Sequence, residues 1–181
     1  GFGALTVVSV AAQAGIATGA VYKHFESKAH LCAEVFRLAT EREVAVVREN
    51  ALGPGTASQR LRLAVEAFAL RALRNPRLAF ALIAEPVDTL VDEQRLLYRR
   101  AYATVFEELL TDGIQSGEFA TQTPSVSAAA LVGVIAESMV GPLSWPQPGQ
   151  TPPQVGPLID AIQAFCLRAV AASRPLNHPP R

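Results

Sequence analysis

The sequence is poor in the residues from which most catalytic and metal sites are built. Its 181 residues include two cysteines, three histidines and one methionine. Cys32 and Cys166 are too few for a disulfide framework, and their apolar surroundings predict reduced thiols in the core. After residue 30 the one histidine is His178, so nitrogen ligands for a transition metal and a base beside Cys166 or a serine are lacking. We therefore expect no cofactor and no enzymatic activity.

Neither sign of charge is in excess, since 16 basic and 16 acidic residues give a formal net charge of zero. This balance argues against binding nucleic acid through bulk positive charge, but it leaves room for a dimer with a few well-placed phosphate contacts. Lysine and arginine are absent from residues 101–167. That part also carries six acids: Glu107, Glu108, Asp112, Glu118, Glu137 and Asp160. We expect it to be acidic and to face away from any nucleic acid.

Strand signals and long apolar runs are also missing. Half of the residues are hydrophobic, but no run of alternating β-branched residues is bounded by turns. The composition therefore predicts an all-α protein. No apolar run reaches the roughly 18 residues of a membrane span without a charge or a proline, and no secretory leader is visible. We expect a cytoplasmic protein without a membrane partner.

Residues 6–28 carry the most informative pattern in the chain. Thr6 can cap a short helix, and Gly15 can supply the sharp turn that ends it. A second short helix would bury Val21 and Phe25 and expose its polar side chains, and Ser27 would begin a third helix. The apolar face of the first helix follows helical spacing at Val7, Val10, Ala11 and Ala14. Two short helices across a glycine-containing turn match a helix-turn-helix, whose second helix enters the major groove of DNA.

This pattern closely resembles the DNA-binding domain of TetR-family transcriptional regulators over about residues 2–38. The most specific portion is Tyr-x-His-Phe-x-x-Lys, at Tyr22, His24, Phe25 and Lys28. The resemblance implies a helix-turn-helix domain at residues 1–45 and a helical ligand-binding and dimerisation domain at residues 46–181. It further implies a repressor that binds a palindromic double-stranded DNA operator as a homodimer. A small, mainly apolar effector would release it. Gly1-Phe2-Gly3 resembles the turn after the family's first helix, so we expect that helix to be missing from this sequence.

The resemblance also implies the roles of single residues. DNA contacts fall on Thr6, Thr18, Gly19, Ala20, Tyr22, Lys23, His24 and Lys28. Lys23 is the candidate for reading a base, because a lysine can donate to guanine O6 and N7, whereas Tyr22, His24 and Lys28 would contact phosphates. The family often has serine at the position of Ala17, where it caps the second helix, so we expect Thr18 to cap it instead. Taken alone, the motif also fits an ordinary helical hairpin, Tyr22 a core tyrosine and His24 a surface histidine.

After the two short helices of the motif, the sequence predicts six helices, at residues 27–49, 57–73, 75–85, 89–116, 125–140 and 158–172. A proline-rich loop at residues 142–157 contains the one tryptophan, Trp145, which we expect to pack against the body or a partner subunit. The last two helices each have more than one apolar face, which favours a four-helix bundle between two subunits. Candidate interface residues are Leu131, Ile135, Met139, Leu158, Ile162 and Phe165.

An effector pocket among the central helices is implied by the same resemblance. Candidate lining residues are Phe68, Ala72, Phe80, Ile83, Tyr98, Tyr102 and Phe106, each of which also fits plain core packing. Glu85 would enter the pocket and orient a polar end of the ligand. The alternative is a solvated, salt-bridged helix start in which Asp92 pairs with Arg95 at i, i+3. The sequence also permits a hard-cation site at Glu85, Asp88 and Asp92, although nothing requires one.

Two functions remain open at this point. The first is a ligand-responsive transcriptional regulator. The second is a helical ligand-binding or dimerisation protein that does not read specific DNA, which the zero net charge and the alanines at positions 17 and 20 favour.

Overall fold

The computed structural model describes residues 2–144 and 154–171. These residues form eight α-helices and no strand, and their one β-type pairing is an isolated bridge between Phe119 and Ala171. The all-α prediction is therefore confirmed. The prediction for Trp145 and the position of His178 lie outside the described residues.

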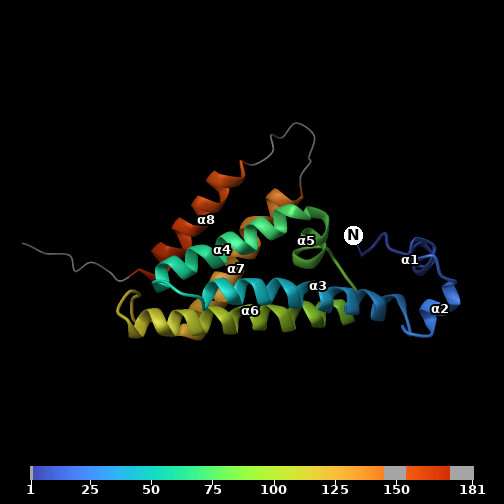
Figure 1. Cartoon of the computed structure of the whole chain (residues 1–181), viewed down its shortest axis with the longest axis horizontal. Coiled ribbons are helices and arrows are strands. Elements are labelled where there is room, and N and C mark those ends of the chain that lie inside the picture. Colours follow the sequence, from blue (N-terminus) through green and yellow to red (C-terminus); the bar gives the residue numbers. More distant parts are fainter. Residues whose placement is uncertain (1, 145–153, 172–181) are drawn as a thin grey trace, which may run out of the picture.

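The molecule is elongated along two long helices that run side by side (Figure 1). These are α3 (Lys28–Ala51) and α6 (Thr89–Gln115). The short helices α1 (Val7–Ala14) and α2 (Thr18–Tyr22) sit at one end of this axis. The other four helices cover the remainder of the axis: α4 (Ala57–Arg74), α5 (Pro76–Ile83), α7 (Pro124–Leu143) and α8 (Val155–Val170).

Local capping chemistry explains most helix starts. The Thr6 hydroxyl accepts the Ser9 N–H at 3.0 Å, and Ser27 accepts the His30 N–H at 3.1 Å, so each satisfies a donor of the first turn that has no partner within its helix. Asn75 caps α5, which has proline in its first turn. Gly15 ends α1 at φ 69°, in the left-handed region that glycine enters without steric cost.

Three hydrophobic clusters hold these helices together. The largest fills the body between α3, α4, α6, α7 and α8 and includes both Leu109 and Cys166. A small second cluster joins α1 and α2 to the start of α3 through Val7, Ala11, Val21 and Leu31. The third lies between these two and is described below. Cys32 and Cys166 are both buried and unpaired, as predicted.

Helix α7 has an unusual composition for a core helix. By length and composition it is the one helix in the described part of the chain that would be able to cross a membrane, and 28% of its most apolar window is buried. Length and composition do not distinguish such a span from a core helix, and α7 packs against α4, α5, α6 and α8. Its apolar residues therefore divide between a side that faces the core and a side that faces outward.

Candidate nucleic-acid interface and internal pocket

Helix α2 presents polar side chains at the end of the molecule. It has 5 residues, little more than one helical turn, and Val21 anchors it in the cluster with α1 and α3. Tyr22 is 54% exposed, and Gly19, Lys23 and His24 are also exposed, whereas Thr18 and Ala20 are half-buried. The helix ends at Tyr22, and the His24 and Phe25 N–H groups that follow it both donate to the Val21 carbonyl.

The start of α2 differs from the expectation for Thr18. Ala17 is the N-cap residue, and no side chain caps this helix. Thr18 therefore occupies the first helical position, and its hydroxyl makes no hydrogen bond within the described residues. The prediction that Thr18 caps the helix is wrong, and its hydroxyl remains open to an external partner.

Two other candidate contacts are used inside the protein. The Thr6 hydroxyl and the Thr6 N–H both bond with Ser9, in a reciprocal cap of α1. The exposed Lys28 ammonium donates to the Gly3 carbonyl at 3.2 Å. An ammonium has three donors, so Lys28 keeps capacity for a phosphate. The Thr6 hydroxyl is used by the cap, so at α1 the remaining first-turn amides would be the donors open to a phosphate.

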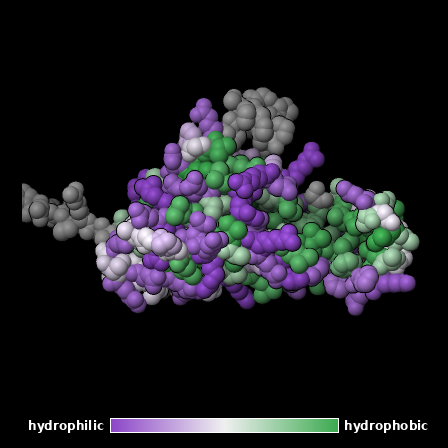
Figure 2. All heavy atoms as spheres, in the orientation of Figure 1, coloured by the Kyte–Doolittle hydropathy of each residue, from purple (hydrophilic) through white to green (hydrophobic). Residues whose placement is uncertain are grey.

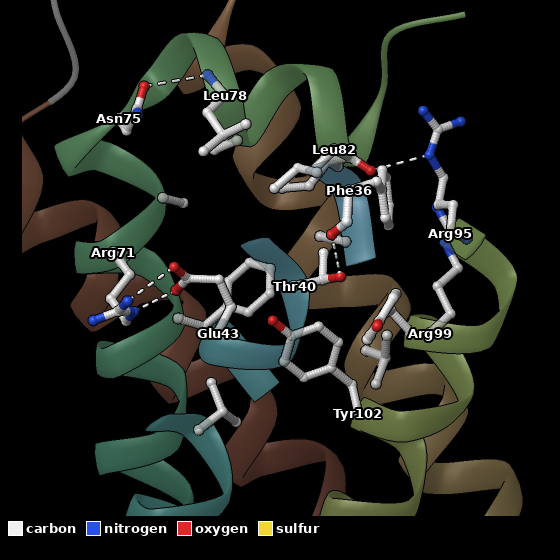
Figure 3. A pocket seen from close by; sticks show the side chains of 18 residues that line it. Phe36, Thr40, Glu43, Arg71, Asn75, Leu78, Leu82, Arg95, Arg99 and Tyr102 are labelled. Atoms are coloured by element: carbon white, nitrogen blue, oxygen red, sulfur yellow. Dashed lines mark hydrogen bonds and ion pairs between the residues drawn. The ribbon is translucent and has the colours of Figure 1, made fainter. Parts of the chain in front are cut away.

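A cavity of about 110 Å³ lies in the body, between α3, α4, α5, α6 and α7. Figure 3 shows side chains from these helices converging on it. Its apolar lining consists of Phe36, Val47, Phe68, Ala72, Leu78, Ala79, Leu82, Ile83, Val132 and Ala136. Its polar lining consists of Thr40, Glu43, Arg71, Asn75, Arg95, Tyr98, Arg99 and Tyr102.

The structure corrects part of the predicted pocket. Phe68, Ala72, Ile83, Tyr98 and Tyr102 line the cavity. Three other predicted residues do not: Phe80, Glu85 and Phe106. The Phe106 ring is 1% exposed in the body core, Phe80 packs against that core, and Glu85 points to the N-terminal end of the chain. Four lining residues come from α3 and were not predicted: Phe36, Thr40, Glu43 and Val47.

Most polar groups of the cavity are already paired. The Arg71 guanidinium binds the Glu43 carboxylate through two hydrogen bonds, with Nη2 at 2.9 Å from Oε1. The Thr40 hydroxyl donates to the Phe36 carbonyl at 2.6 Å. By contrast, the Arg99 guanidinium and the Tyr102 hydroxyl make no hydrogen bond in the described part of the chain. Both groups are therefore open to a ligand.

The two pocket tyrosines are neutral donors at physiological pH. Burial raises the pKa of the Tyr102 phenol far above its ordinary value, and the nearby Glu43 carboxylate adds to this effect. Burial also raises the pKa of Tyr98. A buried phenol resists ionisation because the low-dielectric interior disfavours its anion. Tyr102 thus offers a hydroxyl rather than a charge.

The acidic residues near the end of α5 have separate roles. Glu85 bonds the Phe2 and Gly3 amides, Asp88 caps α6 by accepting the Leu90 N–H at 3.1 Å, and Asp92 pairs with Arg95 at 3.0 Å. The predicted i, i+3 pair of Asp92 and Arg95 is thus confirmed. Within residues 2–144 and 154–171, no group of three acidic, cysteine or histidine side chains is placed to hold a metal ion, and the hard-cation site is not formed.

The predicted dimer residues are mostly buried within one chain. Leu131, Ile135, Met139 and Ile162 are each at most 4% exposed in the body core. Of the six predicted residues, Phe165 is the one that is exposed, at 50%, and Leu158 is half-buried. On α7 the predicted residues lie on the face that packs in the chain's own core. Both faces of this helix are apolar, and helical periodicity does not say which one meets α6. The outward residues of α7 are Ser125, Val126, Ala129, Ala130, Gly133, Glu137 and Gly141.

Two family models match the chain. The model described as bacterial regulatory proteins of the tetR family matches residues 1–35, and the tetracyclin repressor-like C-terminal domain matches residues 54–140. The chain belongs to the TetR family. Its helix-turn-helix and its helical body are thus the two parts of a TetR-type regulator.

Solved structures of other regulatory proteins share this fold. FadR from Bacillus subtilis, solved in complex with stearoyl-CoA, is 19% identical with a TM-score of 0.79, over 93% of this chain and 90% of that one. FadR from Bacillus halodurans is 18% identical with a TM-score of 0.79, over 98% and 89%. AibR, solved with isovaleryl coenzyme A and operator DNA, is 15% identical with a TM-score of 0.67, over 91% and 88%. Comparison with curated protein sequences gives no match.

Proposed function

We propose that this TetR-family chain is a cytoplasmic, ligand-responsive repressor that binds an operator as a homodimer and is released by a small effector. The observation that carries the proposal is the coexistence of two open sites in one chain. One is the exposed polar face of α2, and the other is the cavity of about 110 Å³ in the body. Helix α2 lies in the stretch matched by the first family model, and most lining residues of the cavity lie in the stretch matched by the second.

The DNA-reading role is assigned to α2 and its flanks. Tyr22, Lys23 and His24 are exposed and make no side-chain hydrogen bond within the described residues. The open hydroxyl of Thr18 adds a second candidate for base reading beside Lys23, since threonine can bond either type of base. With zero net charge, affinity would depend on these few contacts from each of two subunits rather than on a broad basic surface.

The effector we propose is an acyl thioester of coenzyme A. The cavity is apolar on the sides formed by Phe36, Phe68 and Val132, which suits acyl carbons, and from its volume of about 110 Å³ it would have to widen to take a long chain. Arg99 and Tyr102 supply open donors for the polar end, and Arg99 is exposed at the rim. The structures of FadR with stearoyl-CoA and of AibR with isovaleryl coenzyme A support this class.

The dimer would form through the outward faces of α7 and α8. These faces carry small and apolar residues around Ala130 and Gly133 on α7 and around Ala161 and Phe165 on α8. Figure 2 shows hydrophobic residues over α8 on this side of the molecule. Small residues allow helix backbones to approach closely, and a second copy would bury what one copy leaves exposed. The domain boundary would fall within α3, whose start packs with α1 and α2 and whose end packs in the body.

Selection from a random duplex library tests the DNA-binding role. We expect a palindromic consensus, and the logarithm of the affinity should fall linearly with the logarithm of salt concentration. Lys23→Ala should relax the preference at one base pair of each half-site, by about 1–3 kcal/mol of discrimination. Arg42→Ala, at an exposed residue of α3 outside the motif, is the control. Failure to recover any consensus, together with tight binding of stearoyl-CoA, would favour the ligand-binding protein without specific DNA binding.

A further inference from the structure

The two proposed sites are joined by the segment between α5 and α6. Arg95 of α6 lies in the wall of the cavity, with a side chain only 14% exposed. Its guanidinium donates to the carbonyls of Leu82 at 3.0 Å, Ala81 at 3.2 Å and Glu85 at 2.7 Å. Figure 3 shows the bond to Leu82. Arg95 thus satisfies the carbonyls at the end of α5, which have no partner within that helix.

Glu85 continues this connection to the helix-turn-helix. Its carbonyl is held by Arg95, while its carboxylate accepts the Phe2 N–H through Oε2 and the Gly3 N–H through Oε1, both at 3.1 Å. The Gly3 carbonyl in turn accepts from Lys28 at the first turn of α3. A carboxylate that accepts two backbone amides forms charge-assisted bonds, which are stronger than neutral ones. One residue therefore fixes the chain segment that leads into α1.

An apolar contact runs beside the polar one. Phe2 is buried in a cluster with Cys32, Phe36, Ala81 and Val91, between the body and the helix-turn-helix. The Phe2 and Phe36 rings stack with centroids 6.4 Å apart, and Phe36 and Tyr98 follow at 5.9 Å. Phe36 and Tyr98 both line the cavity. The cavity wall thus contacts the start of the helix-turn-helix through side chains as well as through Arg95 and Glu85.

We propose that this junction, with Arg95 and Glu85 as its positioning residues, transmits occupancy of the cavity to the helix-turn-helix. The inference rests on the proposed function of the cavity. A ligand that draws the Arg95 guanidinium towards its own anion, or that moves Phe36 and Tyr98, removes the support of the α5 carbonyls. The Glu85 carboxylate then loses its hold on Phe2 and Gly3. Occupancy couples to DNA binding because the two states differ in these contacts.

Glu85→Gln tests the transmission directly. The amide keeps one acceptor oxygen but places an N–H₂ group against a backbone amide. We expect the ratio of the DNA Kd with stearoyl-CoA to the DNA Kd without it to fall at least fivefold relative to the unmodified protein, by loss of one charge-assisted bond pair. Glu118→Gln is the matched control, because Glu118 also accepts two backbone amides, those of Ala57 and Ser58. Its ratio should remain within about twofold of the unmodified value.

A measurement without ligand separates this proposal from the proposed function. Arg95→Lys removes the three-carbonyl contact without touching Phe2 or Gly3, since a lysine cannot reproduce the planar fork. We expect amide hydrogen exchange at Phe2 and Gly3, followed by NMR, to accelerate about fivefold. Arg60→Lys is the control, because Arg60 is 13% exposed and likewise bonds a carbonyl and an aspartate.

These two experiments give distinguishable outcomes. Unchanged exchange at Phe2 and Gly3 in Arg95→Lys, or an unchanged Kd ratio in Glu85→Gln, would overturn the transmission through the junction. If instead stearoyl-CoA has no effect on DNA binding of the unmodified protein, the proposed effector class fails, and the exchange rates still decide whether Arg95 and Glu85 connect the cavity to the helix-turn-helix.

Discussion

At the scale of single residues, the pairing of polar groups decides which of them a ligand or DNA can use. Arg71 and Arg99 both line the cavity, but Arg71 is bound to Glu43 whereas Arg99 has no partner among the described residues. Thr6 and Thr18 differ in the same way, since Thr6 caps α1 and the Thr18 hydroxyl is open. Residue type alone does not separate the members of either pair.

Arg99 is expected to contribute to effector binding. Arg99→Gln should weaken stearoyl-CoA binding about tenfold, because a charge-assisted hydrogen bond contributes about 1.5–3 kcal/mol. Titration calorimetry measures the change. Arg100→Gln is the control, since Arg100 is the exposed neighbour that does not line the cavity. Equal affinities of the two variants would remove Arg99 from the site.

The two cysteine thiols should be unreactive in the folded protein. Burial raises the pKa of Cys166 to about 11, and burial also raises the pKa of Cys32. Because the thiolate is the reactive species, a chromogenic disulfide reagent at pH 8 should label neither residue in the native state and both in guanidinium chloride. Rapid labelling of native protein at this pH would contradict their burial.

At the scale of helices, long-range contacts finish what local caps begin. Glu118 follows α6 in the sequence, yet it accepts the first amides of α4 at 2.9 and 3.1 Å. Phe119, the next residue, is 4% exposed and lies directly over Gly113 of α6. The Ala120 N–H also donates to the Val170 carbonyl at the end of α8, at 2.9 Å, so the turn after α6 joins α4, α6 and α8.

The Glu118 cap should make stability depend on pH. The Ala57 and Ser58 amides hold the pKa of the Glu118 carboxyl below its ordinary value. Its contribution is therefore present above the unfolded-state pKa and is lost as pH falls through the lower folded-state pKa. Glu118→Gln should cost about 1 kcal/mol in urea unfolding at pH 7, and the difference should shrink towards pH 3. A difference that is the same at both pH values would contradict this assignment.

Gly113 should tolerate no side chain. A Cβ atom at this position would lie 2.2 Å from the Phe119 ring, so Gly113→Ala must displace a buried aromatic residue. We expect a loss of about 1–3 kcal/mol in the free energy of unfolding, as for other overpacked cores. Gly19→Ala is the control, because a Cβ there meets no atom within 4 Å and helix propensity favours alanine. Unfolding curves in urea compare the two.

At the scale of the whole molecule, the distribution of apolar surface points to a second subunit. Helices α7 and α8 contribute to the core with one face and leave a second apolar face outside. The helix-turn-helix lies at the opposite end of the long axis from α8 (Figure 1). A dimer through α7 and α8 would leave both copies of α2 exposed, as reading two half-sites requires.

Charge on the outward face of α8 should dissociate the proposed dimer. Phe165→Asp should shift the protein from dimer to monomer in sedimentation at micromolar concentration, because it buries a carboxylate without a partner. Leu97→Asp is the control, since Leu97 is similarly exposed, at 52% against 50% for Phe165, but lies on α6. Dissociation by Leu97→Asp alone would place the interface on α6 instead.

The sequence alone determined most helix starts and ends and the helix-turn-helix itself. Thr6, Gly15, Ser27 and Pro76 act on residues within a few positions of themselves, so their effects can be read without the fold. The family motif is likewise local, since it spans about residues 2–38.

Only the tertiary structure decided which face of α7 is buried, which polar groups of the cavity are open, and where Glu85 points. Glu85 bonds amides that are 82 and 83 residues away in the sequence. An amphipathic pattern shows that a helix has an apolar face, but packing against other helices selects among several such faces. These features depend on contacts between distant segments, and no local pattern of residues encodes them.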